Sequence, residues 1–390
     1  MQTTQLLFTD YIMAGVQASL DRVRAAEYTV PEADRQQAWH ILSFALDAPT
    51  TWPVTRELLL ALAPKMEQAG FREEWIPYLE KGVHCAQNIG DGRVAAECEL
   101  QIGLLHRLLS RFDEASRWTT ASIEHFAAQE DSNGQARALN ELSWLEHLQH
   151  HYQAASQHIE QALDLLAEGD PERAMSYRVK GMVTFHQGNL QEAAAYHRQA
   201  FELFEQQKEL RRAAWSLQNL AIALHWQNKF EVAFECYRKA AAILTEINDI
   251  SNWGIVQMNF GSAYYYFGNA AEAVKHLVNA ETIANQLHDK LQLARVHTHL
   301  GLAHLALNDY SKSEKAFILS INEYNALGDH GWRLNAMDGL AMTYLASKQY
   351  TQAMTVLQQA LAALPEVASL PNYDYLQQSL TKHLEEAEKK

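Results

Sequence analysis

Histidine and carboxylate residues stand at a spacing that could support metal chemistry in one stretch of the chain. His147 and His151 are four residues apart, with Glu146 beside the first of them. Two histidines at this spacing share one face of a helix, but a zinc ion needs three or four converging ligands. No second Glu–His element follows in register, so the sequence predicts a solvated histidine-rich turn, no metal and no other cofactor. Further histidines lie together on one predicted helix: His297, His299 and His304.

Motifs for phosphate binding or acyl transfer are missing from the sequence. Neither G-x-x-x-x-G-K-S/T nor G-x-G-x-x-G occurs, and these are the glycine-rich turns that cradle phosphates. A serine nucleophile at an elbow needs a preceding strand. The chain has no Val/Ile/Thr-rich alternating run that would predict a strand. We therefore expect an all-α protein that is not an enzyme.

Acidic residues recur about every 40 positions along the chain. Several follow glycine or asparagine, such as Gly90, Gly169, Asn248 and Gly328, which tolerate the left-handed backbone that closes a helix. The acid can then accept backbone N–H groups of the next helix, which stabilises by about 1 kcal/mol. Carboxylates on successive repeats lie too far apart to share an ion, so we predict helix caps. The acids are Asp91, Asp131, Asp170, Glu209, Asp249, Asp289 and Asp329.

These acids belong to an internal repeat, and each copy of the repeat predicts a pair of helices. The stretch Ala214–Asp249, with its turn at Gln227–Lys229, shows the pattern most clearly. A small residue in the middle of each first helix serves as the marker of its copy, and further small residues follow twelve and nineteen positions later. Small side chains let two helices approach closely, and because one pair cannot bury its own apolar face, the copies must stack. The markers are Gly103, Ser143, Gly181, Ala221, Gly261, Gly301 and Ala341. Nine positions after each marker stands a residue that is large or apolar: Phe112, Tyr152, Leu190, Phe230, Ala270, Tyr310 and Tyr350.

Two copies carry a resemblance to a known family. The chain is similar to the tetratricopeptide repeat pattern at Leu220, Ala221, Asn228, Phe230, Ala233, Tyr237 and Ala240, and again at Leu300, Gly301, Asn308, Tyr310 and Phe317. That family repeats at about 34 residues and closes its second helix with proline, whereas this chain repeats near 40 with an acidic step. It resembles the longer form in kinesin-light-chain-like proteins and in sensor regions of bacterial signalling ATPases. The resemblance implies a right-handed α-α superhelix of about seven to eight stacked hairpins.

Charge and cysteine content limit the partners and the compartment. Lys plus Arg is 32 and Asp plus Glu is 47, a net charge of −15, which argues against nucleic acid and anionic membrane as partners. No run of 18 apolar residues and no basic segment before an apolar core occurs, so we expect neither a membrane span nor a signal peptide. Cys85, Cys98 and Cys236 form no CxxC pair, so we expect reduced thiols in a cytoplasmic protein.

We expect three parts along the chain. Residues 1–52 form a helical cap, 53–364 form the solenoid with a degenerate first repeat at 53–90, and 365–390 form a C-terminal capping helix. The alternative for residues 1–52 is a docking element for another chain. The cap is expected to contain helices Gln5–Ala26 and Pro31–Leu46, separated by a break at Glu27–Pro31 and followed by a linker at Asp47–Pro53.

Prolines give two further expectations. Pro64 and Pro77 fall inside the helices predicted for the first repeat, so at least one of these helices should start late or bend. Pro365 and Pro371 mark the exit from the last repeat, and a single helix is predicted over Tyr373–Glu388.

The resemblance also implies a binding surface, because in this family the first helix of each pair lines the concave groove. Transferred position by position, the groove holds aromatic and methionine side chains: Trp144, Met182, Phe185, Trp215, Trp226, Met258, Tyr265 and Tyr266. Amides and guanidinium groups lie beside them: Asn140, Gln218, Asn219, Asn259, Arg137, Arg178 and Arg295. Aromatic rings give contact area at low entropic cost, and asparagine can bond both backbone groups of an extended peptide. The competing interpretation is that these aromatics are core.

The sequence thus predicts a scaffold or adaptor that holds a protein or peptide partner in the groove. The alternative is a ligand-responsive, signal-sensing regulator whose superhelix changes shape when an effector binds. Neither the identity of the partner nor the oligomeric state follows from the sequence.

Overall fold

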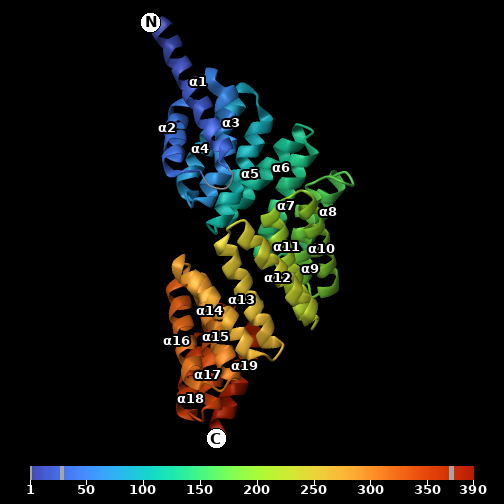
Figure 1. Ribbon diagram of the computed structural model, residues 1–390, viewed down its shortest axis with the longest axis vertical. Helices are drawn as coiled ribbons and strands as arrows, with labels where there is room; N and C mark the ends of the chain where they lie inside the picture. Colours follow the sequence, from blue (N-terminus) through green and yellow to red (C-terminus); the bar gives the residue numbers. More distant parts are fainter. Residues whose placement is uncertain (1, 27–29, 369–372) are drawn as a thin grey trace. The chain divides into compact units, whose positions relative to one another are not determined.

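The computed structural model describes residues 2–26, 30–368 and 373–390. These residues form nineteen α-helices and two short 3-10 helices, with no strand among them (Figure 1). The chain divides into two compact units, unit 1 over Met1–Gly188 and unit 2 over Asn189–Lys390. The predicted all-α repeat architecture is confirmed.

Within each unit, every helix from α3 to α9 and from α10 to α19 packs against the next one in the chain. Unit 1 contains α1 (Gln2–Ala25), α2 (Glu32–Ala45), η1 (Pro49–Thr51), α3 (Trp52–Gln68), α4 (Arg72–Ile89), α5 (Gly92–Leu108), α6 (Phe112–Ala128), α7 (Ser132–Leu148), α8 (Tyr152–Leu165) and α9 (Arg173–His186).

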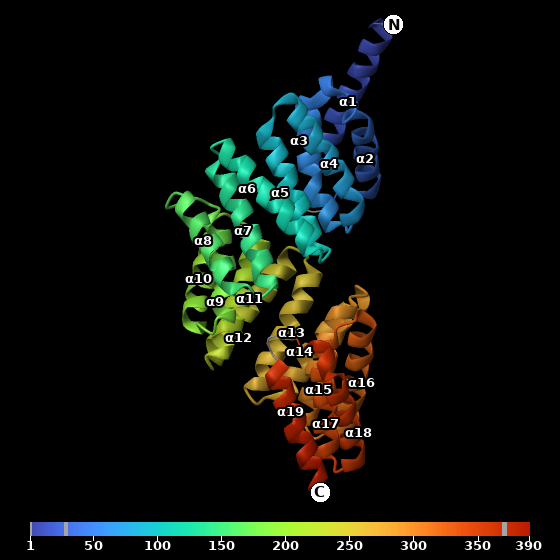
Figure 2. The same ribbon diagram turned by 180° about the vertical axis from the view of Figure 1, so that it is seen from behind.

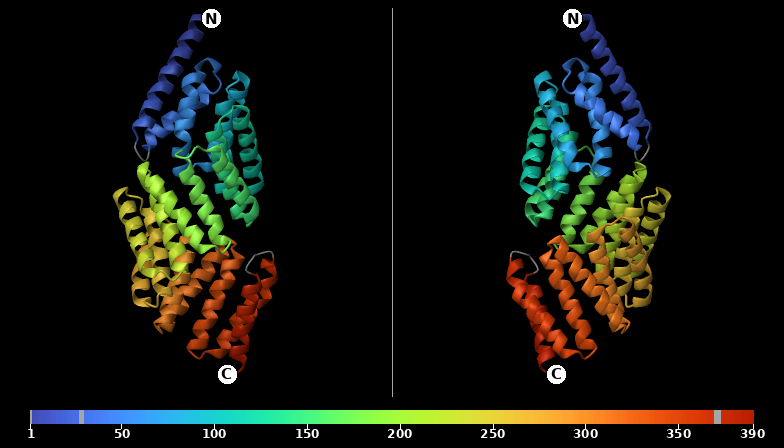
Figure 3. Two further views of the ribbon diagram at one scale, coloured as in Figure 1. Left: turned by 90° about the vertical axis from the view of Figure 1, so that its right-hand side faces the viewer. Right: turned by 90° about the vertical axis from the view of Figure 1, so that its left-hand side faces the viewer.

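Unit 2 contains α10 (Leu190–Gln206), α11 (Leu210–Trp226), α12 (Phe230–Glu246), α13 (Ile250–Tyr266), α14 (Ala270–Gln286), α15 (Lys290–Ala306), α16 (Tyr310–Leu327), α17 (His330–Ala346), α18 (Tyr350–Ala363), η2 (Leu364–Val367) and α19 (Tyr373–Glu388). Its last helices lie side by side in a row (Figure 3), and Figure 2 labels the helices of this unit.

The hairpin turns follow one geometry in all seven copies. The residue nine positions after each marker is the first residue of the second helix, from Phe112 at α6 to Tyr350 at α18. Two positions earlier the backbone is left-handed in every copy, including non-glycine residues such as Asn228 at φ 58° and Ser110 at φ 57°. The predicted turn at Gln227–Lys229 is therefore confirmed, and its left-handed residue recurs where the sequence has serine, histidine or lysine.

The small-residue columns are buried, as close helix approach requires. The hydroxyls of Ser143 and Ser313 donate to backbone carbonyls of the paired helix, to Ala155 at 2.8 Å and Gly301 at 2.8 Å. A Cβ added at Gly261 would lie 3.0 Å from the carbonyl oxygen of Ala273. Backbone of one helix thus meets backbone of the other, which leaves no room for a larger side chain.

The acid column caps helices in most copies, as predicted, and two of its seven members differ. Carboxylate oxygens accept the backbone N–H three residues on in five copies: Asp91, Asp131, Asp249, Asp289 and Asp329. Asp170 instead accepts from the N–H of Glu172, and Glu209 makes no side-chain cap bond. Gly169 does not adopt a left-handed φ, because α8 ends early at Leu165 and a longer loop leads to α9.

The acid column also ties successive repeats together, which the sequence did not reveal. In three copies the carboxylate that starts one first helix pairs with an arginine near the start of the preceding first helix. The pairs are Arg56–Asp91 at 2.7 Å, Arg93–Asp131 at 2.8 Å and Arg211–Asp249 at 2.7 Å. One carboxylate therefore stabilises both a helix end and the step between repeats.

The prolines do not delay the start of either helix, and the alternative expectation, a bend, stays a prediction. Helix α3 runs through Pro64 and α4 runs through Pro77. Trp75, which replaces the expected alanine, is fully buried; it stacks on Tyr78 at 5.4 Å and meets the edge of Trp39 at 6.0 Å. This aromatic contact with α2 provides the packing that holds the start of α4 despite its proline.

The N-terminal helices are present, and most of the predicted linker lies between α2 and α3. Helix α1 begins earlier than predicted, at Gln2, and α2 is capped by Pro31. The predicted linker Asp47–Pro53 forms η1 and then enters α3 at Trp52, which is buried. Most of the predicted break at residues 27–31 and the predicted exit residue Pro371 lie outside the described residues. Helices α1 and α2 share one apolar core with α3, α4 and α5.

The C-terminal helix has the predicted bounds, Tyr373–Glu388. It is held to α17 by Asp338, which accepts hydrogen bonds from Ser379 at 2.7 Å and from His383 Nδ1 at 2.6 Å. The division of the chain into two caps and a solenoid stays a prediction.

Candidate functional site

The predicted binding residues of unit 1 are largely engaged with one another. Trp144 is half-buried on α7, with the guanidinium carbons of Arg178 at 4.7 Å and Arg107 at 5.6 Å from its ring centroid. Arg107 also pairs with Glu141. The tryptophan face thus already receives cations from its own chain.

Two polar residues of the same unit point to structural roles. Arg137 donates two hydrogen bonds to Glu97, at 2.7 and 2.9 Å. Asn140 is only 3% exposed and donates to Glu172 Oε1 at 3.2 Å. Met182 and Phe185 are half-buried on α9. Because Asn140 presents no open surface, we leave it out of the site proposed below.

Unit 2 carries the predicted residues on three successive first helices. Trp215, Gln218 and Asn219 are half-buried on α11, as are Asn259 on α13 and Arg295 on α15. The amides of Gln218, Asn219 and Asn259 make no side-chain hydrogen bond with any other described residue. These carboxamides therefore stay available to a ligand on this face.

Met258 differs from its neighbours on α13. It is 6% exposed and packs in a core with Leu277, Val296 and Leu300. The next residue, Asn259, is half-buried, so a step of one residue separates core from surface here. Met258 therefore belongs to the core beneath the surface that carries Asn259, and it is also left out of the proposed site.

An exposed row of rings, which we name the aromatic ridge, consists of Trp226, Tyr266 and Phe267. Trp226 ends α11 and Tyr266 ends α13, so they hold equal positions in neighbouring repeats. Their ring centroids are 5.5 Å apart, and Phe267 packs on Phe230 at 5.3 Å. The three side chains are 50%, 49% and 47% exposed. Tyr265, beside the ridge, is half-buried and contacts Tyr266 at 5.2 Å.

His225 lies beneath the aromatic ridge. Its ring stacks on Trp226 at 5.4 Å and contacts Tyr266 at 5.2 Å, and the residue is 5% exposed. Burial lowers its pKa to about 4, and neither ring nitrogen has a hydrogen-bond partner among the described residues. His225 is therefore an uncharged aromatic support at neutral pH.

A layer of further rings holds the ridge in place. Phe234 stacks on Tyr264 at 4.3 Å and contacts Phe267 edge-on at 5.5 Å. Phe260 stacks on His276 at 4.2 Å, and His276 Nδ1 lies 2.7 Å from the amide oxygen of Gln257. Because each exposed ring rests on another ring, the ridge is pre-organised for contact.

Sequence reasoning did not name His225 or Phe267. Both follow a marker closely, His225 four residues after Ala221 and Phe267 six residues after Gly261. The sequence signal that could have indicated them is the cluster of aromatic residues at the ends of α11 and α13. Which of those rings points outward depends on the helix that packs behind it, and this is set by tertiary contacts.

The histidine-rich turn of unit 1 is not fully solvated, which corrects the sequence prediction. His147 is buried against His186, with ring centroids 4.9 Å apart, and against Tyr152. Burial, together with the nearby His186 and His150, lowers its pKa to about 4. The other two residues of the motif, His151 and Glu146, are joined by a contact of 2.8 Å. In the described residues no three His, Cys, Asp or Glu side chains are grouped as metal ligands.

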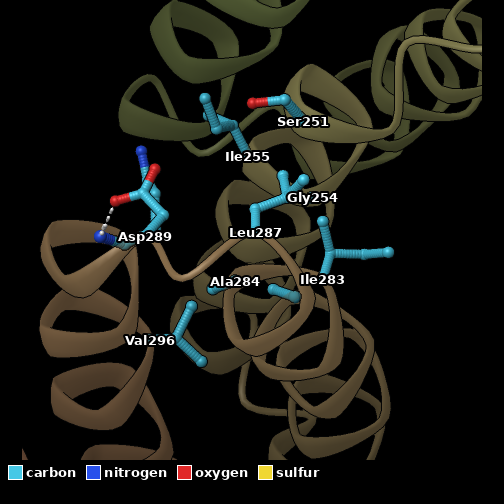
Figure 4. A pocket seen from close by; sticks show the side chains of 10 residues that line it. Ser251, Gly254, Ile255, Ile283, Ala284, Leu287, Asp289 and Val296 are labelled. Carbon is cyan, nitrogen blue, oxygen red and sulfur yellow. Dashed lines mark hydrogen bonds between the residues drawn. The ribbon is translucent and has the colours of Figure 1, made fainter.

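Two hollows are found outside the ridge. One, between α13, α14 and α15, is lined by Gly254, Ile283 and Val296 (Figure 4) and has a volume of about 10 Å³, which holds about one water molecule. The other, of about 370 Å³, lies between α1 and α2 and is lined by residues that include Tyr11 and Phe44. The first is too small for an organic ligand.

None of the described helices combines the length and the apolar character that crossing a membrane requires.

Comparison with known proteins adds a family and a fold. Residues 172–246 match the family model of the tetratricopeptide repeat. No curated protein matches the sequence.

Three solved structures are similar over most of this chain. A Rap protein complexed with Competence and Sporulation Factor has a TM-score of 0.57 at 13% identity, covering 86% of this chain and 98% of that one. Aspartyl phosphate phosphatase F from Bacillus subtilis has a TM-score of 0.56 at 13% identity, covering 90% and 93%. A signal transduction ATPase with a tetratricopeptide repeat sensor, from Pyrococcus horikoshii, has a TM-score of 0.57 at 15% identity, covering 90% of this chain and 50% of that one.

At these identities the likeness concerns the fold. The family match identifies tetratricopeptide repeats at residues 172–246, and the solved structures share the fold of stacked helix pairs.

Proposed function

We propose that this protein binds a segment of a partner protein on the first-helix face of unit 2. The observation that carries the proposal is the aromatic ridge, where Trp226 and Tyr266 are each about half exposed although they lie on adjacent repeats in mutual contact. Exposed apolar side chains that form one patch mark interaction sites. Tryptophan and tyrosine are also the residues that most often dominate binding energy.

The amides of the same face supply the polar part of the site. Gln218, Asn219 and Asn259 lie on α11 and α13 without intramolecular side-chain hydrogen bonds in the described chain. An extended peptide backbone offers one donor and one acceptor per residue, and a carboxamide can satisfy both. The rings of the aromatic ridge would contact apolar side chains of the bound segment. Further contacts to the segment would come from Trp215, Tyr265 and Arg295. Arg137, Trp144, Arg178 and Met182 of unit 1 are proposed only as a secondary surface.

A second candidate function is a regulator that responds to an effector. It is favoured by the division into two compact units at Gly188, since units with separate cores can move as bodies. Small-angle scattering with and without the bound peptide separates the candidates. Compaction supports the regulator, whereas an unchanged profile with tight binding supports the scaffold.

The remaining attributes form part of the same proposal. A net charge of −15 disfavours nucleic acid and anionic membrane as partners. Three free cysteines are consistent with a cytoplasmic protein, and we propose a binding role and not an enzymatic one. Residues 1–52 and 365–390 are proposed to cap the repeats.

The test uses affinity capture followed by measurement with the purified partner. The variant Asn219→Ala with Asn259→Ala removes two amides of the face, and Asn279→Ala on the second helix α14 is the matched control, since Asn279 is exposed on the other helix of its pair. We expect the double variant to raise the Kd for the purified partner at least tenfold. The control should leave this Kd unchanged. Equal affinity for all three proteins would refute binding on this face.

A further inference from the structure

Helices α1 and α2 pack on each other (Figure 1) and leave a hollow of about 370 Å³ between them. Pockets that bind small molecules in proteins begin at about this size. At roughly 30 Å³ for each water molecule, the hollow would hold about twelve of them. This volume suits a ligand of about a dozen non-hydrogen atoms.

Burial separates the floor of the hollow from its rim. Ile12 and Ser19 of α1 are 2% and 1% exposed, whereas Tyr11 of α1 and Phe44 of α2 are 75% and 47% exposed. All four residues line the hollow. The rings of His40 and Phe44 meet edge to face, with their centroids 5.1 Å apart. A ligand would therefore rest on a buried floor, with aromatic side chains of both helices at the rim.

The hydroxyl group of Ser19 is the polar feature of the floor. Its Oγ is buried and has no hydrogen-bond partner among the described residues. In a helix, a serine or threonine hydroxyl can donate to the carbonyl four residues earlier, as Thr55 does to Thr51 at 2.9 Å, but Ser19 makes no such bond. A buried polar group without a partner is unfavourable. The hydroxyl group is therefore available to a polar group of a ligand in the hollow.

The lining also limits the charge of the ligand. None of the described residues that line the hollow is Asp, Glu, Lys or Arg. Charged groups of the same two helices pair elsewhere, since Arg22 of α1 lies 3.1 Å from Asp34 of α2. An ionised ligand would lose its hydration here without gaining a counter-charge. The lining thus favours a neutral molecule.

We propose that this hollow binds a neutral aromatic molecule of about a dozen non-hydrogen atoms that carries one polar group. Its aromatic body would contact Tyr11 and Phe44, because aromatic rings pair favourably with one another. Its polar group would form a hydrogen bond with the Ser19 hydroxyl. The site belongs to unit 1 and does not depend on the partner-binding face proposed for unit 2.

The test uses 2-naphthol as the probe and naphthalene as the matched compound that lacks the hydroxyl group. Equilibrium dialysis with the full chain measures the binding of both. We expect 2-naphthol to bind with a Kd below about 1 mM, which is a modest affinity for a molecule of this size. Ser19→Ala should weaken 2-naphthol about three- to tenfold, the scale of one neutral hydrogen bond, and leave naphthalene unchanged. This variant should not lower the thermal midpoint of the free protein, since the lost hydroxyl group has no partner there.

Variants of the lining locate the bound probe. Ala14→Trp places a large side chain on an exposed residue of the lining and should abolish the binding of both compounds. Ala18→Trp is the matched control, because Ala18 is exposed on the same helix but does not line the hollow. Phe44→Ser should weaken both compounds about threefold or more, and it replaces Ala14→Trp as the test if circular dichroism shows that Ala14→Trp does not fold.

Three results would overturn the inference. The first is that 2-naphthol does not bind to the wild-type chain. The second is that binding persists unchanged in Ala14→Trp and Phe44→Ser, because the probe then lies elsewhere on the protein. The third is that Ser19→Ala affects the two compounds equally or not at all. A dimer that dissociates in Tyr11→Ser, seen by light scattering together with absent probe binding, would instead assign the hollow to a second copy of the chain.

Discussion

At the scale of single residues, the clearest constraint is the buried ring of Phe317. A Cβ added at Gly301 would lie 2.7 Å from this ring, and one added at Gly339 would overlap it from the next repeat. Phe317 is fully buried, so the ring has little room to move away. Two glycines in successive first helices thus accommodate one aromatic side chain of the intervening second helix.

We predict that Gly339→Ala lowers the free energy of unfolding by about 1–3 kcal/mol, because overpacking forces the ring or the backbone to shift. Urea denaturation followed by circular dichroism measures the change. Adding Phe317→Leu to this variant should recover part of the loss, because the smaller side chain frees the space. Gly169→Ala is the control, since nothing lies within 4 Å of the added Cβ. A loss as large in the control would contradict this account.

The residue scale also separates the members of the acid column. Asp249 is buried, accepts the N–H of Asn252 at 3.2 Å and pairs with Arg211 at 2.7 Å. Glu209, at the equivalent position one repeat earlier, makes no side-chain cap bond. The two residues therefore hold equivalent positions in their repeats but contribute differently to stability.

Asp249→Ala is expected to reduce stability by about 1–3 kcal/mol, since a cap bond and an ion pair to a buried carboxylate are both lost. Glu209→Ala should change stability by less than about 0.5 kcal/mol. Asp249→Asn should fall between the two, because the amide oxygen can still accept the cap bond. The midpoints of urea unfolding of the three variants measure these changes. Equal losses of stability in Asp249→Ala and Glu209→Ala would contradict the prediction.

At the scale of helices, polar contacts join the second half of unit 2. His297 on α15 is buried, with Nε2 at 3.0 Å from Glu281 on α14 and Nδ1 at 2.8 Å from Glu323 on α16. Burial disfavours the charged imidazole, but the hydrogen bonds to the two carboxylates outweigh it and raise the pKa to about 9. One imidazolium thus links three consecutive helices.

The raised pKa predicts a pH-dependent contribution to stability. A group with a folded pKa of about 9 and an unfolded pKa of about 6.5 stabilises fully below pH 6.5 and loses this effect as pH rises through 9. His297→Gln should therefore cost on the order of 2–3 kcal/mol at pH 6 and much less at pH 10. Unfolding of both proteins across this range measures the difference. His330→Gln, at an exposed pair with Glu366, should show little change, and a pH-independent cost of His297→Gln would refute the linkage.

At the scale of the whole molecule, stability is distributed over neighbouring repeats. Within each unit, the helices from α3 to α9 and from α10 to α19 pack on the next one in the chain, and the two compact units have separate clusters of buried side chains. In such an array the effect of a local change decays with distance along the row. A single free energy of unfolding need not describe the chain as a whole.

Hydrogen exchange with mass spectrometry tests this distribution. In Gly339→Ala we expect faster exchange in α15 to α18, which adjoin the strained ring of Phe317, and unchanged exchange in α3 to α7 of unit 1. A uniform increase in both units would mean that the chain unfolds as one cooperative body. Wild-type protein at the same urea concentration serves as the reference.

Periodic and local features were predictable from the sequence. The hairpin turn at Asn228, the capping by Asp249 and the bounds of α19 depend on residues within a few positions of one another. The small columns around Gly261 repeat at a fixed spacing, and periodicity reports burial when a fold repeats. By itself, then, the sequence determined the repeat, the helix pairs and most of their ends.

The side of each helix that stays open was decided by the tertiary structure. One residue along a helix turns the side chain by about 100°, so Met258 enters the core while Asn259 stays at the surface. His147 became buried because His186 of a later helix packs against it, and Pro77 is accommodated in α4 because Trp75 packs on Trp39. Contacts from helices distant in sequence set these outcomes. For the same reason the aromatic ridge follows from the packing of α11 against α13, not from the run of aromatics in either helix alone.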